Sequence, residues 1–291
     1  MVLFLYEAEG NMTIKFTKMN GLGNDFIILD YNEYQETNLT PDKLALKLCN
    51  RNFSIGADGL IIVNPNTDKA DISWIFYNSD GSVAQMCGNG MRCFARYVCD
   101  NKIIDKKEFS VETKAGIIIP KIISDDEVRV NMGQPVLKPK KIPLNNPTNL
   151  NIPYKIDNNS FELNAISMGN PHCIIFVKAN SKDLALKFGS TIENDILFPE
   201  KTNVEFVEIL SKNEVVINVW ERGCGITLAC GTGACATTVA GILNAYLNNK
   251  VKANLPGGSL VIEWQGNPED TKHNVYMTGR ADYSFIGEIE V

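Results

Sequence analysis

Histidine is scarce in this sequence, and the motifs that bind nucleotide cofactors are missing. Only two of the 291 residues are histidine, His172 and His273, although histidine is the side chain that most often titrates near neutral pH. No Gly-x-Gly-x-x-Gly run follows a predicted strand, and there is no Walker phosphate loop. We therefore expect no cofactor, and an enzyme with this sequence would have to move protons with other side chains.

Cysteine is present, but not in the spacing typical of metal and cluster sites. No Cys-x-x-Cys pair occurs, which argues against a zinc ribbon, a thioredoxin-type site and an iron–sulfur cluster. Eight thiols are too few for a disulfide scaffold in a chain of this length, so we expect a reducing cytoplasm. The cysteines are Cys49, Cys87, Cys93, Cys99, Cys173, Cys224, Cys230 and Cys235.

A basic surface and a membrane anchor are also missing. The formal charge is −6, and no stripe of Lys and Arg occurs, so we expect no nucleic-acid partner. Residues 1–11 form a short apolar extension without the basic start or cleavage site of a signal peptide. Residues 228–247 are uncharged and as long as a membrane span. Their Gly, Thr and Asn content and their lack of basic flanks favour a buried helix of a soluble domain instead.

What is present is a globular composition, 44% hydrophobic and 21% charged, which suits two domains with their own cores. Most predicted elements are short strands, because β-branched and aromatic runs end at turn residues. The predicted strands are residues 14–16, 26–29, 60–63, 72–77, 117–123, 128–131, 161–166, 173–177, 204–209, 215–220, 260–264 and 275–279. Helices are predicted at residues 41–50, 89–100, 182–189 and 232–247, the first with Thr40 as its cap.

Three features of the first half recur in the second at a nearly constant offset. Each half has a Gly-Asn pair shortly before a strand, a Cys-Gly-x-Gly turn that opens a helix, and a polar residue nine positions before that Cys. We call residues 87–90 the first elbow and residues 230–233 the second elbow; their cysteines are 143 residues apart. Such recurrence predicts two copies of one unit. The matched residues are Asn24 and Asn170, Asn78 and Glu221, and Cys87 and Cys230.

The helix after each elbow is apolar enough to be wrapped by strands. We therefore predict an α+β fold of two pseudo-symmetric repeats, each a curled, mostly antiparallel, barrel-like sheet around a central helix, with the active site in the cleft between them. The first repeat would cover residues 1–131 and the second residues 132–277. A C-terminal strand at about 278–291 is expected to return to the first repeat.

Each elbow combines a thiol with a site for an anion. The glycines expose the backbone N–H groups of the first helical turn, which favour negative charge together with the helix dipole. The same field should lower the pKa of Cys87 and of Cys230 and make thiolate available near neutral pH. Two elbows facing each other could hold a carboxylate while one thiolate removes a proton and one thiol returns it on the other face, which is racemisation or epimerisation. The other six cysteines are expected to be buried packing.

A different class of protein would use the same two thiols. If they lie close together, Cys87 and Cys230 could form a disulfide or bind a metal, as in a thiol redox or metal-binding module. Recurrence of the whole elbow favours the acid/base pair, for which we expect no metal.

The motifs around the elbows resemble those of the diaminopimelate epimerase family, from Phe16 to nearly the C-terminus. In the first half they are Phe16-Thr17-Lys18-Met19, Gly21-Leu22-Gly23-Asn24-Asp25-Phe26, Gly56-Ala57-Asp58-Gly59, Tyr77-Asn78-Ser79-Asp80-Gly81 and Met86-Cys87-Gly88-Asn89-Gly90-Met91-Arg92-Cys93. In the second half they are Met168-Gly169-Asn170-Pro171-His172, Thr202-Asn203-Val204, Trp220-Glu221-Arg222-Gly223 and Ala229-Cys230-Gly231-Thr232-Gly233-Ala234.

The resemblance implies a cofactor-independent epimerase that interconverts LL- and meso-2,6-diaminopimelate on the route to lysine and cell-wall cross-links, with Cys87 and Cys230 as the acid/base pair. The reacting carboxylate and amine would be held by Gly88, Asn89, Glu221, Gly231 and Thr232. The distal end of the substrate would be held by Asn24, Asn78, Asn170, Asn203 and Arg222. His172 would be a structural or supporting residue, and His273 a surface residue.

The sequence departs from the family pattern at the extension, residues 1–11, and at Ile226, which stands where the family commonly has an acid beside the second elbow. A proline racemase-like enzyme of the same fold is the alternative within the fold group. Exposed strand edges favour a homodimer.

Overall fold

The computed structural model describes residues 12–291, so the predicted extension at residues 1–11 lies outside the described residues. One sheet contains β1 (Thr13–Gly21), β2 (Asn24–Asp30), β3 (Gly59–Asn64), β4 (Ile72–Asn78), β5 (Val111–Thr113), β6 (Gly116–Ile118) and β18 (Asp282–Glu290). The other contains β7 (Pro120–Ile122), β8 (Glu127–Asn131), β9 (Ile152–Ile156), β10 (Asn159–Ser167), β11 (Pro171–Val177), β12 (Asn203–Ser211), β13 (Glu214–Glu221), β14 (Gly225–Ile226), β15 (Lys250–Leu255), β16 (Gly258–Trp264) and β17 (Val275–Arg280). The helices are α1 (Tyr31–Glu36), α2 (Pro41–Leu48), α3 (Gly88–Asp100), α4 (Ser181–Glu193) and α5 (Gly231–Leu243), with a 3-10 turn η1 at Pro139–Lys141.

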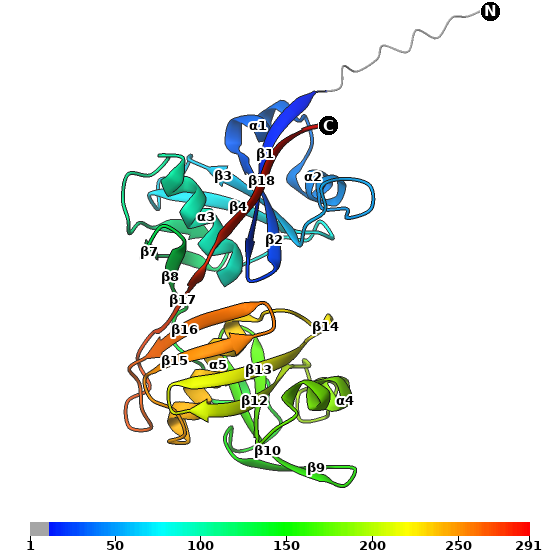
Figure 1. The fold of residues 1–291 in the computed structure, drawn as a ribbon, viewed down its shortest axis with the longest axis vertical. Helices are drawn as coiled ribbons and strands as arrows, with labels where there is room; N and C mark the ends of the chain where they lie inside the picture. The colour runs from blue at the N-terminus through cyan, green and yellow to red at the C-terminus, as the bar shows by residue number, and fades with distance from the viewer. Residues whose placement is uncertain (1–11) are drawn as a thin grey trace, which may run out of the picture.

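The two sheets lie one above the other along the long axis of the molecule (Figure 1). The first has the strand order β18-β1-β2-β3-β4-β5-β6, and the second β7-β8-β17-β16-β15-β13-β12-β11-β10-β9. Antiparallel pairs predominate in both. The α+β class is confirmed, although neither sheet closes into a barrel within residues 12–291.

The strand order itself repeats. Strands β1 to β6 follow one another in the first sheet as β10, β11, β12, β13, β15 and β16 do in the second. The parallel pairs also correspond, with β2–β3 matching β11–β12 and β4–β5 matching β13–β15. Helix α3 connects β4 to β5, and α5 connects β13 to β15. The predicted internal repeat is therefore present as a repeated topology with one helix at the same point of each copy.

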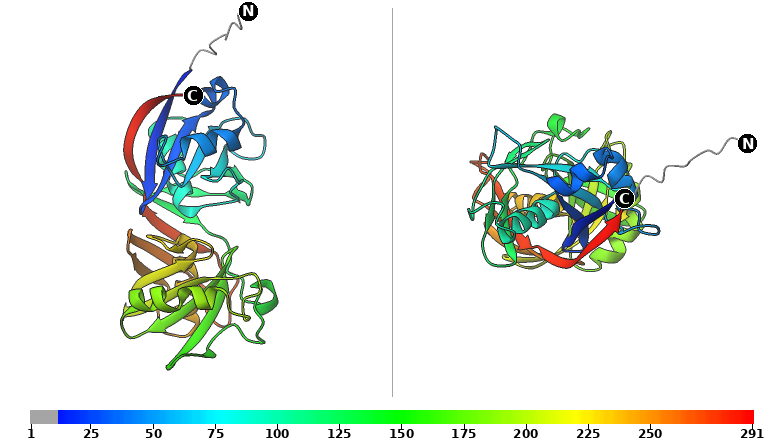
Figure 2. Two further views of the ribbon diagram at one scale, coloured as in Figure 1. Left: turned by 90° about the vertical axis from the view of Figure 1, so that its right-hand side faces the viewer. Right: turned by 90° about the horizontal axis from the view of Figure 1, so that it is seen from above.

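The C-terminal strands connect the two sheets. Strand β17 pairs with β16 and β8 of the lower sheet, and β18 pairs with β1 of the upper sheet. Only Ala281 separates β17 from β18, and the pair runs from one half into the other (Figures 1 and 2). Strands β7 and β8 pair into the second sheet, yet Val128 and Val130 pack in the core around α3. Strands from both sides of residue 131 thus pair within the second sheet. The division of the chain into two repeats at that residue stays a prediction.

Each central helix lies in its own core. Met91 and Phe94 of α3 are fully buried against the first sheet, and burial of one such side chain contributes about 1.5–3 kcal/mol. Helix α5 is buried on nearly all sides, and the hydroxyl of its Thr238 donates to the Ala234 carbonyl instead of remaining unpaired. In the described part of the chain, no helix is long and apolar enough to cross a membrane.

Several element boundaries differ from the predictions for local reasons. The predicted strand at residues 117–123 is two strands in the structure. Strand β6 pairs with β5, whereas β7, which begins at Pro120, pairs with β8. Helix α5 ends at Leu243, where the Asn244 side chain binds the Ala240 carbonyl and Ala245 takes a left-handed conformation. Helix α1 and strands β5, β9, β14 and β15 were not predicted.

Thr40 is the N-cap of α2, as predicted, with Pro41 at the first position, although in the described structure the Thr40 side chain makes no capping hydrogen bond. One further local prediction was wrong. Cys224 is exposed and Cys99 half-buried, so not all six remaining cysteines are buried packing.

Two hairpin tips from different halves meet at a glycine. Gly257, in the turn between β15 and β16, donates its N–H to the Leu228 carbonyl. A Cβ atom at Gly257 would lie 2.1 Å from the carbonyl oxygen of Leu22, in the turn between β1 and β2. Only a residue without a side chain therefore permits this contact between backbones.

We expect Gly257→Ala to push these hairpins apart and to lower the free energy of unfolding by about 1–3 kcal/mol, because backbone atoms cannot move aside as a flexible side chain can. Urea denaturation measures the change. Ser160→Ala, at an exposed position of the hairpin formed by β9 and β10, is the control and should have almost no effect. An equally small change in Gly257→Ala would contradict this account of the contact.

Candidate active site

The two elbows meet at the buried side chain of Met277, which extends from β17. A Cβ atom at Gly88 would lie 2.5 Å from the Met277 methyl carbon, and one at Gly231 would lie 3.0 Å from its sulfur. The Gly231 position would also be 3.6 Å from the Asn89 amide oxygen. The N-termini of α3 and α5 therefore approach each other at glycines, with Met277 packed against both.

In the first elbow, Cys87 is the N-cap of α3. Its sulfur accepts a hydrogen bond from the Gly90 N–H at 3.5 Å and contacts the Asn24 amide oxygen at the same distance. That oxygen also accepts from the Asn89 side chain at 3.2 Å. The structure thus brings together Cys87, Asn24 and Asn89, although the resemblance assigned Asn24 to the distal end of the substrate and Asn89 to the reacting end.

Asn24 is held by a network of charged residues that the sequence analysis did not assign to the site. Its amide nitrogen donates to Asp58 at 2.7 Å, which leaves the amide oxygen directed at Cys87. Asp58 is in turn bound by Arg51, which also binds Asp25. Burial favours a higher pKa for Asp25, but its hydrogen bonds to Arg51 and to a buried lysine hold that pKa well below the usual range.

In the second elbow, Cys230 is the N-cap of α5 and almost fully buried. Its sulfur lies 3.5 Å from the Thr232 hydroxyl, which accepts a hydrogen bond from the Asn170 side chain at 3.4 Å. The Asn170 amide oxygen lies 3.0 Å from Nε2 of His172. Three predicted residues and His172 therefore form one chain of contacts that ends at the thiol.

The other nitrogen of His172 meets a residue that the sequence analysis missed. Nδ1 lies 2.7 Å from Oε1 of Glu205, and both side chains are fully buried. Oε2 of Glu205 has no hydrogen-bond partner among residues 12–291. The predicted strand at residues 204–209 carries two glutamates, Glu205 and Glu208, and its sequence does not distinguish the buried Glu205 from the partly exposed Glu208.

His172, Glu205 and Cys230 are spaced closely enough to hold a metal ion. One ligand atom each of His172, Glu205 and Cys230 lies within 4.8 Å of the others, and imidazole, carboxylate and thiolate are all zinc ligands. The hydrogen bond between His172 and Glu205 already uses one atom from each of these two residues.

The expected lowering of the thiol pKa values is wrong in its net direction. Burial raises the pKa of Cys87, and the N–H groups of Gly90 and Asn89 only partly offset it. Burial raises the pKa of Cys230 further, because the charges of Glu221 and Glu205 add to it. Burial also raises the pKa of the Glu221 carboxyl group. Desolvation therefore outweighs the helix dipole at both elbows.

Three of the residues expected at the distal end of the substrate make hydrogen bonds to other protein groups in this structure. Asn78 binds Ser82 within its own turn. Asn203 donates to the Pro171 carbonyl and accepts from the Arg222 N–H. The Arg222 side chain is exposed and donates to a neighbouring carbonyl. Their role toward a substrate stays a prediction.

Ile226, which stands where the family pattern has an acid, lies on a short strand beside the second elbow. Ile226, in β14, pairs with Trp220 of β13 and is partly exposed. The next residue, Thr227, donates its hydroxyl to Glu221. Glu221 thus keeps a hydrogen-bond partner in this segment although the acid is absent.

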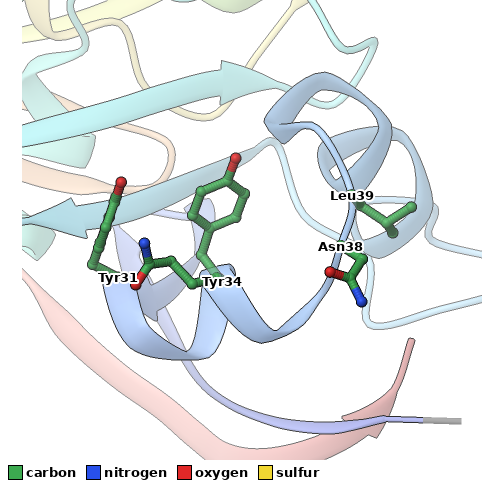
Figure 3. A pocket seen from close by; sticks show the side chains of 5 residues that line it. Tyr31, Tyr34, Asn38 and Leu39 are labelled. Carbon is green, nitrogen blue, oxygen red and sulfur yellow. The ribbon is translucent and has the colours of Figure 1, made fainter. Parts of the chain in front are cut away.

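A surface pocket of about 290 Å³ lies away from the elbows. It is lined by residues of α1 and the turn that follows it, including Tyr31, Tyr34 and Leu39 (Figure 3). Helix α1 packs on β1, β2 and β3, near the end of the chain marked C in Figure 1. No thiol lines this pocket, so we do not assign the chemistry to it.

Comparison with known proteins gives one consistent family. The family model described as diaminopimelate epimerase matches residues 16–138 and 164–284. A diaminopimelate epimerase from Halothermothrix orenii is 48% identical over 289 residues, which cover 96% of this chain and 99% of that protein.

Solved structures with the same fold are more distant in sequence. A phenazine biosynthesis protein of the PhzF family from Bacillus anthracis has a TM-score of 0.68 at 16% identity, covering 96% of this chain and all of that one. A hydroxyproline epimerase from Agrobacterium vitis has a TM-score of 0.67 at 12% identity, covering 96% and 93%. At these identities the likeness extends to the fold alone.

We expect Glu205→Gln to make Cys230 titrate at lower pH, because it removes a negative charge that raises the pKa of the Cys230 thiol. The rate of alkylation by iodoacetamide against pH, in a Cys87→Ser background, measures this. Glu193→Gln is the control, since Glu193 is also a buried acid but binds Trp220 and the Gly223 N–H. Equal titration of Cys230 in both variants would contradict the role given to Glu205.

Proposed function

The chain belongs to the diaminopimelate epimerase family, and we propose that it interconverts LL- and meso-2,6-diaminopimelate with Cys87 and Cys230 as a two-thiol acid/base pair. The enzyme is an isomerase. The observation that carries the residue assignment is the meeting of two matched elbows, each with a thiol at a helix N-terminus, on either side of Met277. The product would serve lysine and cell-wall precursor synthesis.

In the proposed reaction one thiolate removes the α-hydrogen as a proton. The C–H bond breaks, an S–H bond forms, and the electron pair stays on the substrate carbon. The opposite thiol then gives its proton to the other face of that carbon and becomes the new thiolate. Backbone N–H groups of the first turns of α3 and α5 would stabilise the charge that develops on the substrate carboxylate. The reverse reaction exchanges the two roles.

We assign the ends of the substrate by charge. At the reacting end, the Glu221 carboxylate would attract the ammonium group, with Gly88, Asn89, Gly231 and Thr232 around the carboxylate. At the distal end, the exposed guanidinium of Arg222 is available to pair with the second carboxylate. The distal amides Asn24, Asn78, Asn170 and Asn203 offer both donors and acceptors, which a zwitterionic group needs.

We further propose a cytoplasmic homodimer. All eight cysteines are free thiols, as a reducing compartment favours. Strand β18 is the edge of the first sheet and exposes Phe285 and Ile286, which supports pairing with a second copy. Sedimentation equilibrium of the purified chain measures the oligomeric state.

We expect Cys87→Ser and Cys230→Ser each to abolish epimerisation, because an alcohol is a far weaker acid and base than a thiol. The measurement is conversion of LL- to meso-diaminopimelate, with the two isomers separated by chromatography. Cys224→Ser, at an exposed thiol, should retain full activity.

Two results would decide against this assignment. Full activity of Cys87→Ala would remove the thiol pair from the mechanism. Exchange with proline, together with no exchange with diaminopimelate, would instead support the proline racemase-like alternative.

A further inference from the structure

Arg92 is a fully buried cation near the first elbow. It lies on α3, one turn after Gly88, and is wholly inaccessible to solvent. Its Nε donates to the Arg280 carbonyl at 3.0 Å, and Nη1 lies 3.5 Å from the Gly88 carbonyl and 3.7 Å from the Met277 sulfur. Nη2 has no hydrogen-bond partner in the described part of the chain.

Such a cation is costly to bury. Across residues 12–291 no carboxylate lies within ion-pair distance of Arg92, and the acid whose charge acts on it, Asp282, forms its ion pair with Arg280. A charge removed from water without a partner destabilises the fold unless something else in the site needs it. Its guanidinium keeps its proton at neutral pH even when buried.

The Arg92 guanidinium lies beside the first elbow. A Cβ atom at Gly21 would lie 3.0 Å from Nη2 and 3.3 Å from the Asn89 Cβ, so the guanidinium lies beside the first turn of α3. The thiols whose charges act on it are Cys87 and Cys93 of α3 and Cys235 of α5. Of these three, only Cys87 belongs to the acid/base pair.

The surroundings of the two catalytic thiols are therefore opposite in charge. Cys230 faces two acids, Glu221 and Glu205. The Arg92 guanidinium lies 3.5 Å from the Gly88 carbonyl, beside Cys87, and its positive charge opposes the rise in the pKa of Cys87; Glu221 is the one acid that acts on this thiol. A pair of thiols that shares one negative charge will hold it on the side with the cation.

We propose that Arg92 is a positioning residue that places the negative charge of the ionised thiol pair on Cys87. The inference rests on the proposed two-thiol function. When the pair carries one negative charge, its resting state has Cys87 as the thiolate and Cys230 as the thiol, and this state binds productively the isomer whose α-hydrogen points toward Cys87. After one turnover the proton is on Cys87, and proton exchange with water or the reverse reaction restores the resting state.

The test follows the titration of Cys87 without substrate, so it does not depend on the substrate assignment. In a Cys230→Ser background, iodoacetamide alkylation of the Cys87 peptide is followed by mass spectrometry against pH. Arg92→Met should move the midpoint to higher pH by about one unit or more, a tenfold fall in thiolate at fixed pH. In the otherwise native chain, the alkaline rise of α-hydrogen exchange should move in the same direction.

Three controls separate a charge from a structural role. Arg92→Lys keeps the charge and should keep the midpoint near that of the parent. Arg96→Met, one turn further along α3, removes an arginine that binds Asp100 and the Ala281 carbonyl, and should leave the midpoint unchanged. The melting temperature of Arg92→Met should be maintained or raised, because an unpaired buried charge is lost.

The proposal is overturned if Arg92→Met leaves the Cys87 midpoint in place. It is also overturned if Arg92→Lys shifts the midpoint as far as Arg92→Met does, or if Arg92→Met fails to fold, because each result would give Arg92 a structural role. If the unmodified protein shows no α-hydrogen exchange with diaminopimelate, while Arg92→Met still moves the Cys87 midpoint as expected, the substrate assignment is contradicted instead.

Discussion

The close approach of two helix N-termini at Met277 is the constraint on which the rest of the structure depends. Each terminus begins with a glycine: a Cβ atom at Gly88 would collide with the Met277 methyl carbon, and one at Gly231 would lie in tight contact with the Met277 sulfur. The approach sets two cysteines at the ends of two helices whose dipoles both point at one place. Everything else described near the elbows either holds these termini in position or sets the charge around them.

The backbone of the two halves is repeated, but the side chains that support the elbows are not. Asn24 is fixed by an acid and directs its carbonyl oxygen toward Cys87, whereas Asn170 directs its amino group toward Thr232. The first support is a network of Arg51 with two aspartates, and the second is the pair His172 and Glu205. A symmetric scaffold therefore carries an asymmetric field, as an acid and a base acting on opposite faces require.

Much of this arrangement could be predicted from the sequence, because it depends on local patterns. The offset of 143 residues between the elbows identified the repeat, and strand spacing gave the α+β class. The burial of Glu205 and Arg92 could not be predicted, since it depends on which distant segments cover each side chain. The direction of the thiol pKa shifts was wrong for the same reason: the helix dipole is visible in a sequence, whereas desolvation is a property of the assembled core.

Strand β18 has a consequence for the order in which the molecule is made. It is the last strand within residues 12–291, yet it pairs with β1, the first strand of that range, from Thr13 to Asn20. During synthesis β1 emerges from the ribosome long before its partner exists, so one edge of the first sheet must wait unpaired until residues 282–290 are added. The sheet that begins with β1 is therefore completed only by a strand made much later, and a truncation that removes part of β18 would lose contacts in the half that was synthesised first.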